Sequence, residues 1–268
     1  MYDTLRLDRD DRGIATVTIT ASTMPPTFFA DCEHAFTALA DDGTLRAVVV
    51  QSDAKGFSYG LDLAAAFRDW GTILAGGGTA APRTQLLQLV RKLQRAFNAV
   101  AACPVPVIAA IHGWCIGGGL DLAAACDIRL ATSDTKFSLR ETKVAMVADL
   151  GSLQRLPRLI GQGLTRELAF TGKDVDATRA LAIGLVNEVV ADRAAVHAAA
   201  AAMAAEIAAN PPLVVRGVKQ VLDFGEGKSV ADGLEYVAAW NSAFLASEDL
   251  GEATAAFASR RPPVFKGK

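Results

Sequence analysis

The chain has 268 residues, of which 51% are hydrophobic, and it carries a formal net charge of −2 at pH 7. This length and apolar content predict a globular protein with one large domain, or with a core domain and a small appendage. A sequence pI of about 5.9 leaves no overall basic charge to attract nucleic acid or an anionic membrane surface, so neither is expected as a partner.

Targeting segments and cysteine usage point to an intracellular protein. The N-terminal run MYDTLRLDRDDRG mixes acids with bases and lacks the apolar core of a signal peptide, and the C-terminal FKGK matches no peroxisomal address. No stretch of about 18 residues is apolar enough to cross a bilayer, so we expect no membrane insertion. The cysteines lie in apolar surroundings without a CxxC pair, at Cys32, Cys103, Cys115 and Cys126. We therefore expect reduced thiols, no metal site and a cytoplasmic location.

The first half of the chain alternates between strand and helix patterns. Residues 4–9 and 13–20 flank an acidic turn and predict a hairpin. Residues 26–42 have helical spacing, and 45–52 form a β-rich run typical of a strand covered on both faces. Residues 69–84, DWGTILAGGGTAAPRT, have the composition of a surface loop. The rest of this half predicts a helix at 86–103, a strand at 104–113, a glycine turn, a helix from about 120 to 126, and strands at 127–132 and 136–139.

Beyond residue 150 the pattern becomes mainly helical, interrupted by a strand at 184–190. Helices are expected at 152–161, 164–172, 193–210, 212–225 and within 231–260. The last 60 or so residues resemble a separate helical layer, hinged at the Asn-Pro-Pro of 210–212, of a kind that packs on a partner subunit. We therefore divide the chain into an α/β core over residues 1–208 and a C-terminal helical oligomerisation region over 209–268.

Two glycine-bearing turns, at 55–63 and within 112–130, are candidates for binding a negatively charged oxygen. In the second, glycines follow a strand and a helix begins near Leu120, so unpaired N–H groups and the positive end of the helix dipole face the turn. In the first, Gly60 lets the chain double back and leaves the N–H of Leu61 pointing outward. Two such N–H groups would form an oxyanion hole, although each turn alone is equally explained as a strand-to-helix connection.

Acidic residues stand where the surrounding sequence is apolar. Asp149 lies inside the run VAMVADLG, and Glu141 precedes it. A buried unpaired carboxylate is costly, so it is neutralised, hydrogen-bonded or used in chemistry. Structural explanations exist for each acid. Asp121 would interact with a helix dipole and Asp149 would cap the following helix, while Glu141 would pair with Arg140 or Lys143.

The motifs resemble those of the crotonase superfamily, which contains enoyl-CoA hydratases and isomerases. KGFSYGLDL is similar to its first oxyanion segment and GWCIGGGLDLAAACDIRLAT to its second, and the likeness continues through KFSLRETKVAMVADLGSLQRLPRLIG to the terminal RRPPVFKGK. The resemblance implies a crotonase-like spiral of repeated ββα units with a C-terminal helical trimerisation layer, assembled as a homotrimer or homohexamer. It also implies an acyl-CoA thioester substrate, with coenzyme A as part of the substrate and no other cofactor.

The same resemblance suggests how the acids work. The N–H groups of Leu61 and Gly118 would hold the thioester oxygen while a proton leaves C2. Hydratases of the family carry two water-activating glutamates at the positions of Asp121 and Glu141. The segment with Asp149, however, resembles Δ3,5-Δ2,4-dienoyl-CoA isomerases, which carry Asp, Glu and Asp at the three positions. We therefore favour double-bond isomerisation in fatty-acid degradation, with Glu141 acting at C2, Asp149 at C6, and Asp121 orienting or balancing the charge of the pair.

Two alternatives remain open. One is hydration of a 2-enoyl-CoA by Asp121 and Glu141, and the other is a non-catalytic RNA-binding or interaction protein of the same fold. RNA binding requires a basic helix face, but the best candidate, the predicted helix at 86–103, offers only Arg91, Lys92 and Arg95.

Further residues are expected to contact the substrate or to be structural. We expect substrate contacts from Phe57, Tyr59, Gly60 and Gly117, and contacts with a neighbouring subunit's ligand from Phe265 and Lys266. The family often places a base just after the first oxyanion segment to meet coenzyme A phosphates, but here alanines stand there, with Arg68 a turn further on. Arg155 and Arg158 are interpreted as solvated or ion-paired positions on a helix.

Overall fold

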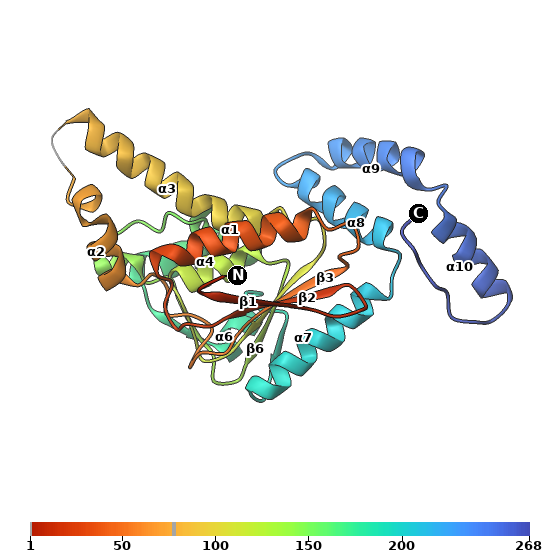
Figure 1. Cartoon of the computed structure of the whole chain (residues 1–268), viewed down its shortest axis with the longest axis horizontal. Coiled ribbons are helices and arrows are strands. Elements are labelled where there is room, and N and C mark those ends of the chain that lie inside the picture. Colours follow the sequence, from red (N-terminus) through yellow and green to blue (C-terminus); the bar gives the residue numbers. More distant parts are fainter. Residues whose placement is uncertain (1, 77–78) are drawn as a thin grey trace.

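The computed structural model describes residues 2–76 and 79–268, which form an α/β fold with two sheets (Figure 1). The larger sheet has six strands in the order β1-β2-β3-β4-β6-β9, and the smaller has the order β5-β7-β8. The strands are β1 (Leu5–Arg9), β2 (Ile14–Ile19), β3 (Ala47–Ser52), β4 (Val107–Ile111), β5 (Trp114–Ile116), β6 (Ile128–Thr132), β7 (Lys136–Ser138), β8 (Asp174–Asp176) and β9 (Glu188–Val190).

Helices cover both faces of the larger sheet and extend beyond it. They are α1 (Pro26–Ala40), α2 (Leu63–Leu74), α3 (Ala80–Ala101), α4 (Gly118–Ala125), α5 (Ser152–Thr171), α6 (Ala177–Ala182), α7 (Arg193–Ala208), α8 (Pro212–Gly225), α9 (Val230–Phe244) and α10 (Glu248–Ala258), with a 3-10 helix at Glu141–Val144. Figure 1 shows α1 and α3 on one side of the sheet and α7 on the other.

The larger sheet has an antiparallel edge and a parallel interior. β1 and β2 form the predicted hairpin, whereas each of the next pairings, from β2–β3 to β6–β9, is parallel. Alternate residues of β3 reach opposite cores: Val48 and Val50 pack toward α1 and α3, while Val49 packs with Ala200 and Ala204 of α7. The alanine-rich sequence of α7 thus lets this helix lie close to the sheet, because small side chains shorten the distance between layers.

The prediction of a surface loop over residues 69–84 is wrong. Helix α2 continues to Leu74, and α3 begins at Ala80, so helix covers both ends of that segment. The N-terminus of α2 is capped, because the side chain of Asp62 accepts a hydrogen bond from the N–H of Ala65 at 2.9 Å. Residues 77–78 of the predicted loop lie outside the described part of the chain.

The C-terminal helices are tied to the core at one end and extend away from it at the other. Arg216 of α8 donates to backbone carbonyl oxygens near the end of α1, including that of Leu45 at 3.0 Å, and the buried Lys219 forms an ion pair with Asp127 at 2.7 Å. α9 and α10 then lie apart from the sheet (Figure 1). Within the described ranges no single helix is long and apolar enough to span a membrane, although α7 and α8, bent by 106°, meet that criterion together.

Candidate active site

The two glycine turns meet beside the smaller sheet. The first turn is aligned on β5, because the N–H of Ser58 donates to the carbonyl of Trp114 at 2.9 Å and the N–H of Ile116 donates back to Ser58 at 3.0 Å. β5 leads directly into the second turn at Gly117, which is held to β7 through the carbonyl of Ser138 at 3.0 Å. Segments that are far apart in the sequence are therefore joined in fixed register.

This close approach requires glycine. Gly60 has a φ of +82°, and a Cβ atom there would lie 2.8 Å from the carbonyl oxygen of Ile116 and 3.2 Å from the nitrogen of Gly118. A Cβ atom on Gly118 would in turn lie 3.8 Å from the nitrogen of Leu61. The nitrogens of Leu61 and Gly118 consequently border the same small space.

Both of these N–H groups are free to bind a ligand. Neither Leu61 nor Gly118 donates a hydrogen bond within the part of the chain that the structure describes. Their neighbours are engaged: Met24 donates to the carbonyl of Gly60 at 2.8 Å and accepts from Asp62 at 2.9 Å. Because α4 begins at Gly118 and not near Leu120 as predicted, the amide of Gly118 belongs to the first turn of this helix, where the dipole favours negative charge.

Glu141 lies against the second glycine turn. A Cβ atom on Gly117 would be 3.1 Å from Oε1 of Glu141, and Oε2 is buried without a hydrogen-bond partner among the described residues. Burial, reinforced by the negative charge of Asp121, raises the pKa of Glu141 to about 7. The explanation of Glu141 by ion pairing is wrong, because Arg140 pairs with Asp174 instead and no cation pairs with Glu141 in the described ranges.

Asp121 is buried and connects two helices. It lies in the first turn of α4, and its Oδ1 accepts a hydrogen bond of 2.6 Å from the N–H of Ser152, the first residue of α5. Oδ2 has no partner among the residues described. Burial raises the pKa of Asp121 to about 6, although the hydrogen bonds with Ser152 and the charge of Arg155 oppose the rise. One oxygen thus has a structural role while the other stays free.

Asp149 does not cap α5 as one prediction supposed. The residue before the helix is Gly151, and no side chain caps the helix there in the described structure. The amide of Ser152 donates its hydrogen bond to Asp121. The side chain of Asp149 is exposed, but the cavity that it lines removes part of its hydration and raises its pKa. Asp149 is therefore available for a ligand.

An apolar cavity of about 450 Å³ brings most of these groups together. The predicted site residues that line it are Tyr59, Gly60, Leu61, Gly117, Gly118, Glu141 and Asp149. Its other walls come chiefly from apolar side chains of α2, α3 and the segment after Glu141. Asp121 does not line the cavity, but it is close enough for its charge to act on Glu141.

Three predicted substrate contacts lie elsewhere. Phe57 is fully buried in the core, so its side chain does not reach the cavity. Phe265 and Lys266 lie on the C-terminal segment, where the carbonyl of Phe265 accepts from Arg46 at 3.0 Å and the N–H of Lys266 donates to Asp249 at 2.7 Å. Neither lines the cavity of its own chain, and their contact with a neighbouring subunit's ligand stays a prediction.

Some residues that shape the site carry no local sequence signal. Met24 fixes the first turn through its backbone, so its side-chain type gives no clue. Gln94 donates to the carbonyl of Asp149 at 2.7 Å, and Arg155, predicted to be solvated or ion-paired, donates to the carbonyl of Leu150 at 3.3 Å. Only the three-dimensional packing of α3 and α5 reveals these last two contacts. Arg158 is ion-paired, with Glu226, as predicted.

The arrangement is suited to proton transfer next to a carbonyl group. Two free N–H groups border one space, where they could stabilise an oxygen that gains negative charge. Carboxyl groups with raised pKa values stand nearby, and the pKa of about 7 at Glu141 suits proton exchange near neutral pH. The apolar walls fit a hydrocarbon chain.

Comparisons with known proteins agree with this geometry. The family described as "Enoyl-CoA hydratase/isomerase" matches residues 9–268. The Δ3,5-Δ2,4-dienoyl-CoA isomerase of Dictyostelium discoideum mitochondria is 37% identical over 99% of this chain and 92% of its own, and the human mitochondrial isomerase of that name is 39% identical over 93% and 77%. The crystal structure of a putative enoyl-CoA hydratase from Streptomyces coelicolor A3(2) superposes with a TM-score of 0.90 at 30% identity, covering 100% of this chain and 96% of its own. Because the family matches nearly the whole chain and these relatives are 37% and 39% identical to it, the chain belongs to the enoyl-CoA hydratase/isomerase family of crotonase-like enzymes.

Proposed function

We propose that this enzyme converts a 3,5-dienoyl-CoA into the 2,4-dienoyl-CoA. The observation that carries the proposal is the presence of Asp149 in the same apolar cavity as Glu141 and the two free N–H groups. Hydration needs acids only around C2 and C3, whereas moving two conjugated double bonds needs a second proton-transfer group further along the chain. Relatives named for this isomerisation, at 37% and 39% identity, support the same reaction.

The proposed mechanism moves one proton off the substrate and one onto it. Glu141 removes a proton from C2, and the electron pair spreads from the thioester carbonyl through C6. The amides of Leu61 and Gly118 stabilise the negative oxygen. The carboxyl group of Asp149 then delivers a proton to C6, which leaves double bonds at C2 and C4. The charge of Asp121 raises the pKa of Glu141 and thereby strengthens it as a base.

The substrate, assembly and location form part of the proposal. The ligand is an acyl-CoA thioester, with coenzyme A entering only as part of the substrate, and the enzyme works as a homotrimer or homohexamer. We place it in the cytoplasm, in keeping with four free and buried cysteines, although the isomerases compared above are named as mitochondrial. Fractionation of the source cells would test this location.

An absorbance assay tests the reaction. Purified protein is mixed with a 3,5-dienoyl-CoA and the conjugated 2,4-dienoyl product is followed in the ultraviolet, with Asp149→Asn run beside it. We expect the chromophore with the wild type and its loss in the variant. Absence of the product from folded wild-type protein would contradict the proposal. If the wild type and Asp149→Asn both hydrate a 2-enoyl-CoA instead, the enzyme is a hydratase that uses Asp121 and Glu141.

A further inference from the structure

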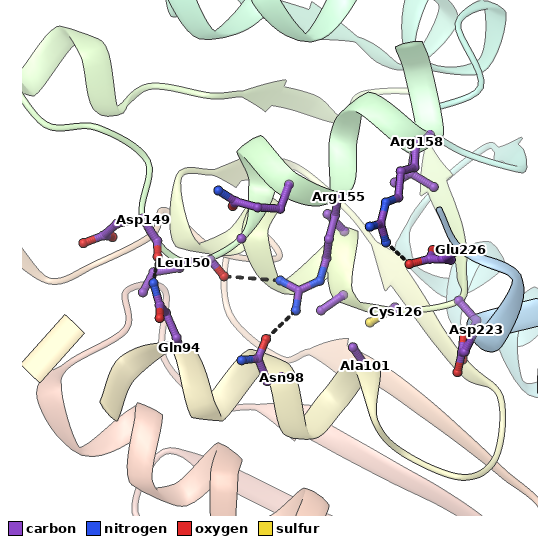
Figure 2. A pocket seen from close by; sticks show the side chains of 16 residues that line it. Gln94, Asn98, Ala101, Cys126, Asp149, Leu150, Arg155, Arg158, Asp223 and Glu226 are labelled. Atoms are coloured by element: carbon purple, nitrogen blue, oxygen red, sulfur yellow. Dashed lines mark hydrogen bonds and ion pairs between the residues drawn. The ribbon is translucent and has the colours of Figure 1, made fainter. Parts of the chain in front are cut away.

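Asp149 and Leu150 line two cavities. One is the apolar cavity described above, and the other is a polar cavity of about 670 Å³. Figure 2 shows the second cavity, with the carboxylate of Asp149 pointing away from Arg155 while the backbone of Leu150 faces it. Groups that line the polar cavity can therefore contact the backbone of Asp149 and Leu150 without approaching the carboxylate of Asp149.

Two polar side chains of the polar cavity bind this segment, and a third orients one of them. Nε2 of Gln94 donates to the carbonyl of Asp149 at 2.7 Å, and Nη1 of Arg155 donates to the carbonyl of Leu150 at 3.3 Å. Nη2 of Arg155 also donates to Oδ1 of Asn98 at 2.7 Å, which fixes the guanidinium plane (Figure 2). Gln94 and Asn98 are one helical turn apart on α3, so they form one face of that helix.

The packing at Gly151 shows how closely Arg155 approaches the backbone. Gly151 has a φ of +123°, and a Cβ atom there would overlap Nη1 of Arg155. The next amide, that of Ser152, is bound by Asp121. Every residue from 149 to 152 is thus fixed by a side chain of another helix or by close packing.

Such fixation matters because the carboxylate of Asp149 accepts no hydrogen bond from another residue in the described structure. Its direction depends on the backbone that carries it. A displacement of about 1 Å in a reacting group can reduce a rate by about 100-fold.

We propose that Gln94 and Arg155 are positioning residues that hold the Asp149 carboxylate at the acyl cavity, with Asn98 orienting Arg155. The inference rests on the proposed function, because these three side chains, called the clamp below, would hold the group that donates a proton to C6. It predicts that loosening the clamp impairs proton delivery at C6 and leaves proton removal at C2 intact.

The polar cavity also supplies a matched control. Arg158 lies on the same helix as Arg155 and lines the same cavity, but it pairs with Glu226 and makes no hydrogen bond to residues 149–151 (Figure 2). Arg158→Met therefore removes an equal charge from the cavity without touching the clamp.

The experiment compares Gln94→Leu, Arg155→Met and Arg158→Met in two assays. The first follows 2,4-dienoyl-CoA formation, and the second follows exchange of the C2 hydrogen in deuterium oxide by mass spectrometry. We expect the Gln94 and Arg155 variants to lose about 10- to 100-fold in kcat with unchanged KM and unchanged C2 exchange, and Arg158→Met to match the wild type. Asn98→Asp, which keeps the acceptor for Arg155, should retain activity that Asn98→Leu loses.

A second comparison separates positioning from general loosening of the site. In an Asp149→Asn background, Gln94→Leu should cause no further loss, because the group that it positions is already inactive. An additional loss there, reduced C2 exchange, or equal behaviour of the Gln94, Arg155 and Arg158 variants would overturn the inference. If the wild type itself forms no 2,4-dienoyl product, it is the proposed function that fails.

Discussion

Glu141 is a half-buried carboxyl group whose ionisation opposes folding. Its pKa is about 7 in the folded chain, against an ordinary value of 4.5. Between these two values the folded state binds more protons than the unfolded state, so stability falls as the pH rises through this window. At about 1.36 kcal/mol per pKa unit, the complete loss above pH 7 is roughly 3 kcal/mol at most. The raised pKa that suits a catalytic base is thus obtained at the expense of stability.

Replacing this carboxyl by an amide should reverse that effect. We expect Glu141→Gln to lose isomerase activity while its free energy of unfolding at pH 8 increases by about 1–3 kcal/mol, with little change at pH 4.5, where the folded wild-type group is protonated. Urea denaturation at the two pH values measures this difference. Glu167→Gln is the control, because Glu167 is exposed, pairs with Lys173 and has a lowered pKa, so it should give no gain. A destabilised Glu141→Gln at pH 8 would contradict the assignment.

Gly118→Ala tests the oxyanion site by filling its space with a methyl group while leaving both N–H donors in the chain. The φ of Gly118 lies outside the left-handed region, so alanine suits the backbone, but the added methyl group would stand 3.8 Å from the nitrogen of Leu61 and 3.2 Å from the sulfur of Met24. We expect Gly118→Ala to remain folded and to lose about 100-fold or more in kcat, the scale of losing one oxyanion donor. Gly163→Ala, whose methyl group meets open space, should keep full activity. A normal kcat in Gly118→Ala would show that the two amides do not stabilise the reacting oxygen.

At the scale of elements, the sequence reveals features that depend on local backbone conformation. The turns at Gly60 and Gly117 need positive φ values, which glycine supplies, so the residue type itself marks them. β5 and β8 have three residues each, too few to show periodicity, and no longer β-rich run marks them as one marks the equally short β7 and β9. The sequence predicts a loop from residue 69 because Gly71 and the glycines after it are typical of loops, whereas in the structure helix α2 continues to Leu74.

The contact between α4 and α5 explains why an acid at position 121 has a structural role as well. Asp121 binds the amide of Ser152, so Asp121→Leu would leave that buried N–H without a partner and should cost about 1–3 kcal/mol. Asp121→Asn keeps an acceptor oxygen and should stay closer to wild-type stability. It also removes the charge that raises the pKa of Glu141, so the acidic limb of the pH–rate profile should move to lower pH.

Denaturation curves and pH–rate profiles of both Asp121 variants check this prediction. Equal destabilisation by leucine and asparagine would show that the hydrogen bond to Ser152 contributes little. An acidic limb that moves to higher pH in Asp121→Asn would contradict the charge coupling between Asp121 and Glu141.

At the scale of the whole molecule, the C-terminal helices expose more apolar surface than their attachment to the core requires. Leu222 of α8 and Leu234 of α9 are 68% and 61% exposed, although Arg216 and Lys219 tie α8 firmly to the core. Large apolar side chains exposed to this degree on neighbouring helices are a feature of interfaces between subunits. The predicted oligomerisation region thus has a surface suited to that role.

Assembly should therefore depend on this surface, and substrate binding should depend on assembly. We expect light scattering to give a mass of three or six times 28.0 kDa for the wild type and a smaller mass for the double variant Leu222→Glu with Leu234→Glu. If Phe265 and Lys266 contact the neighbouring subunit's coenzyme A, dissociation should raise KM for the acyl-CoA more than it lowers kcat. Phe170→Glu, which changes an equally exposed residue on α5, is the control and should leave mass and KM unchanged. A fully active monomeric double variant would show that each chain binds its substrate alone.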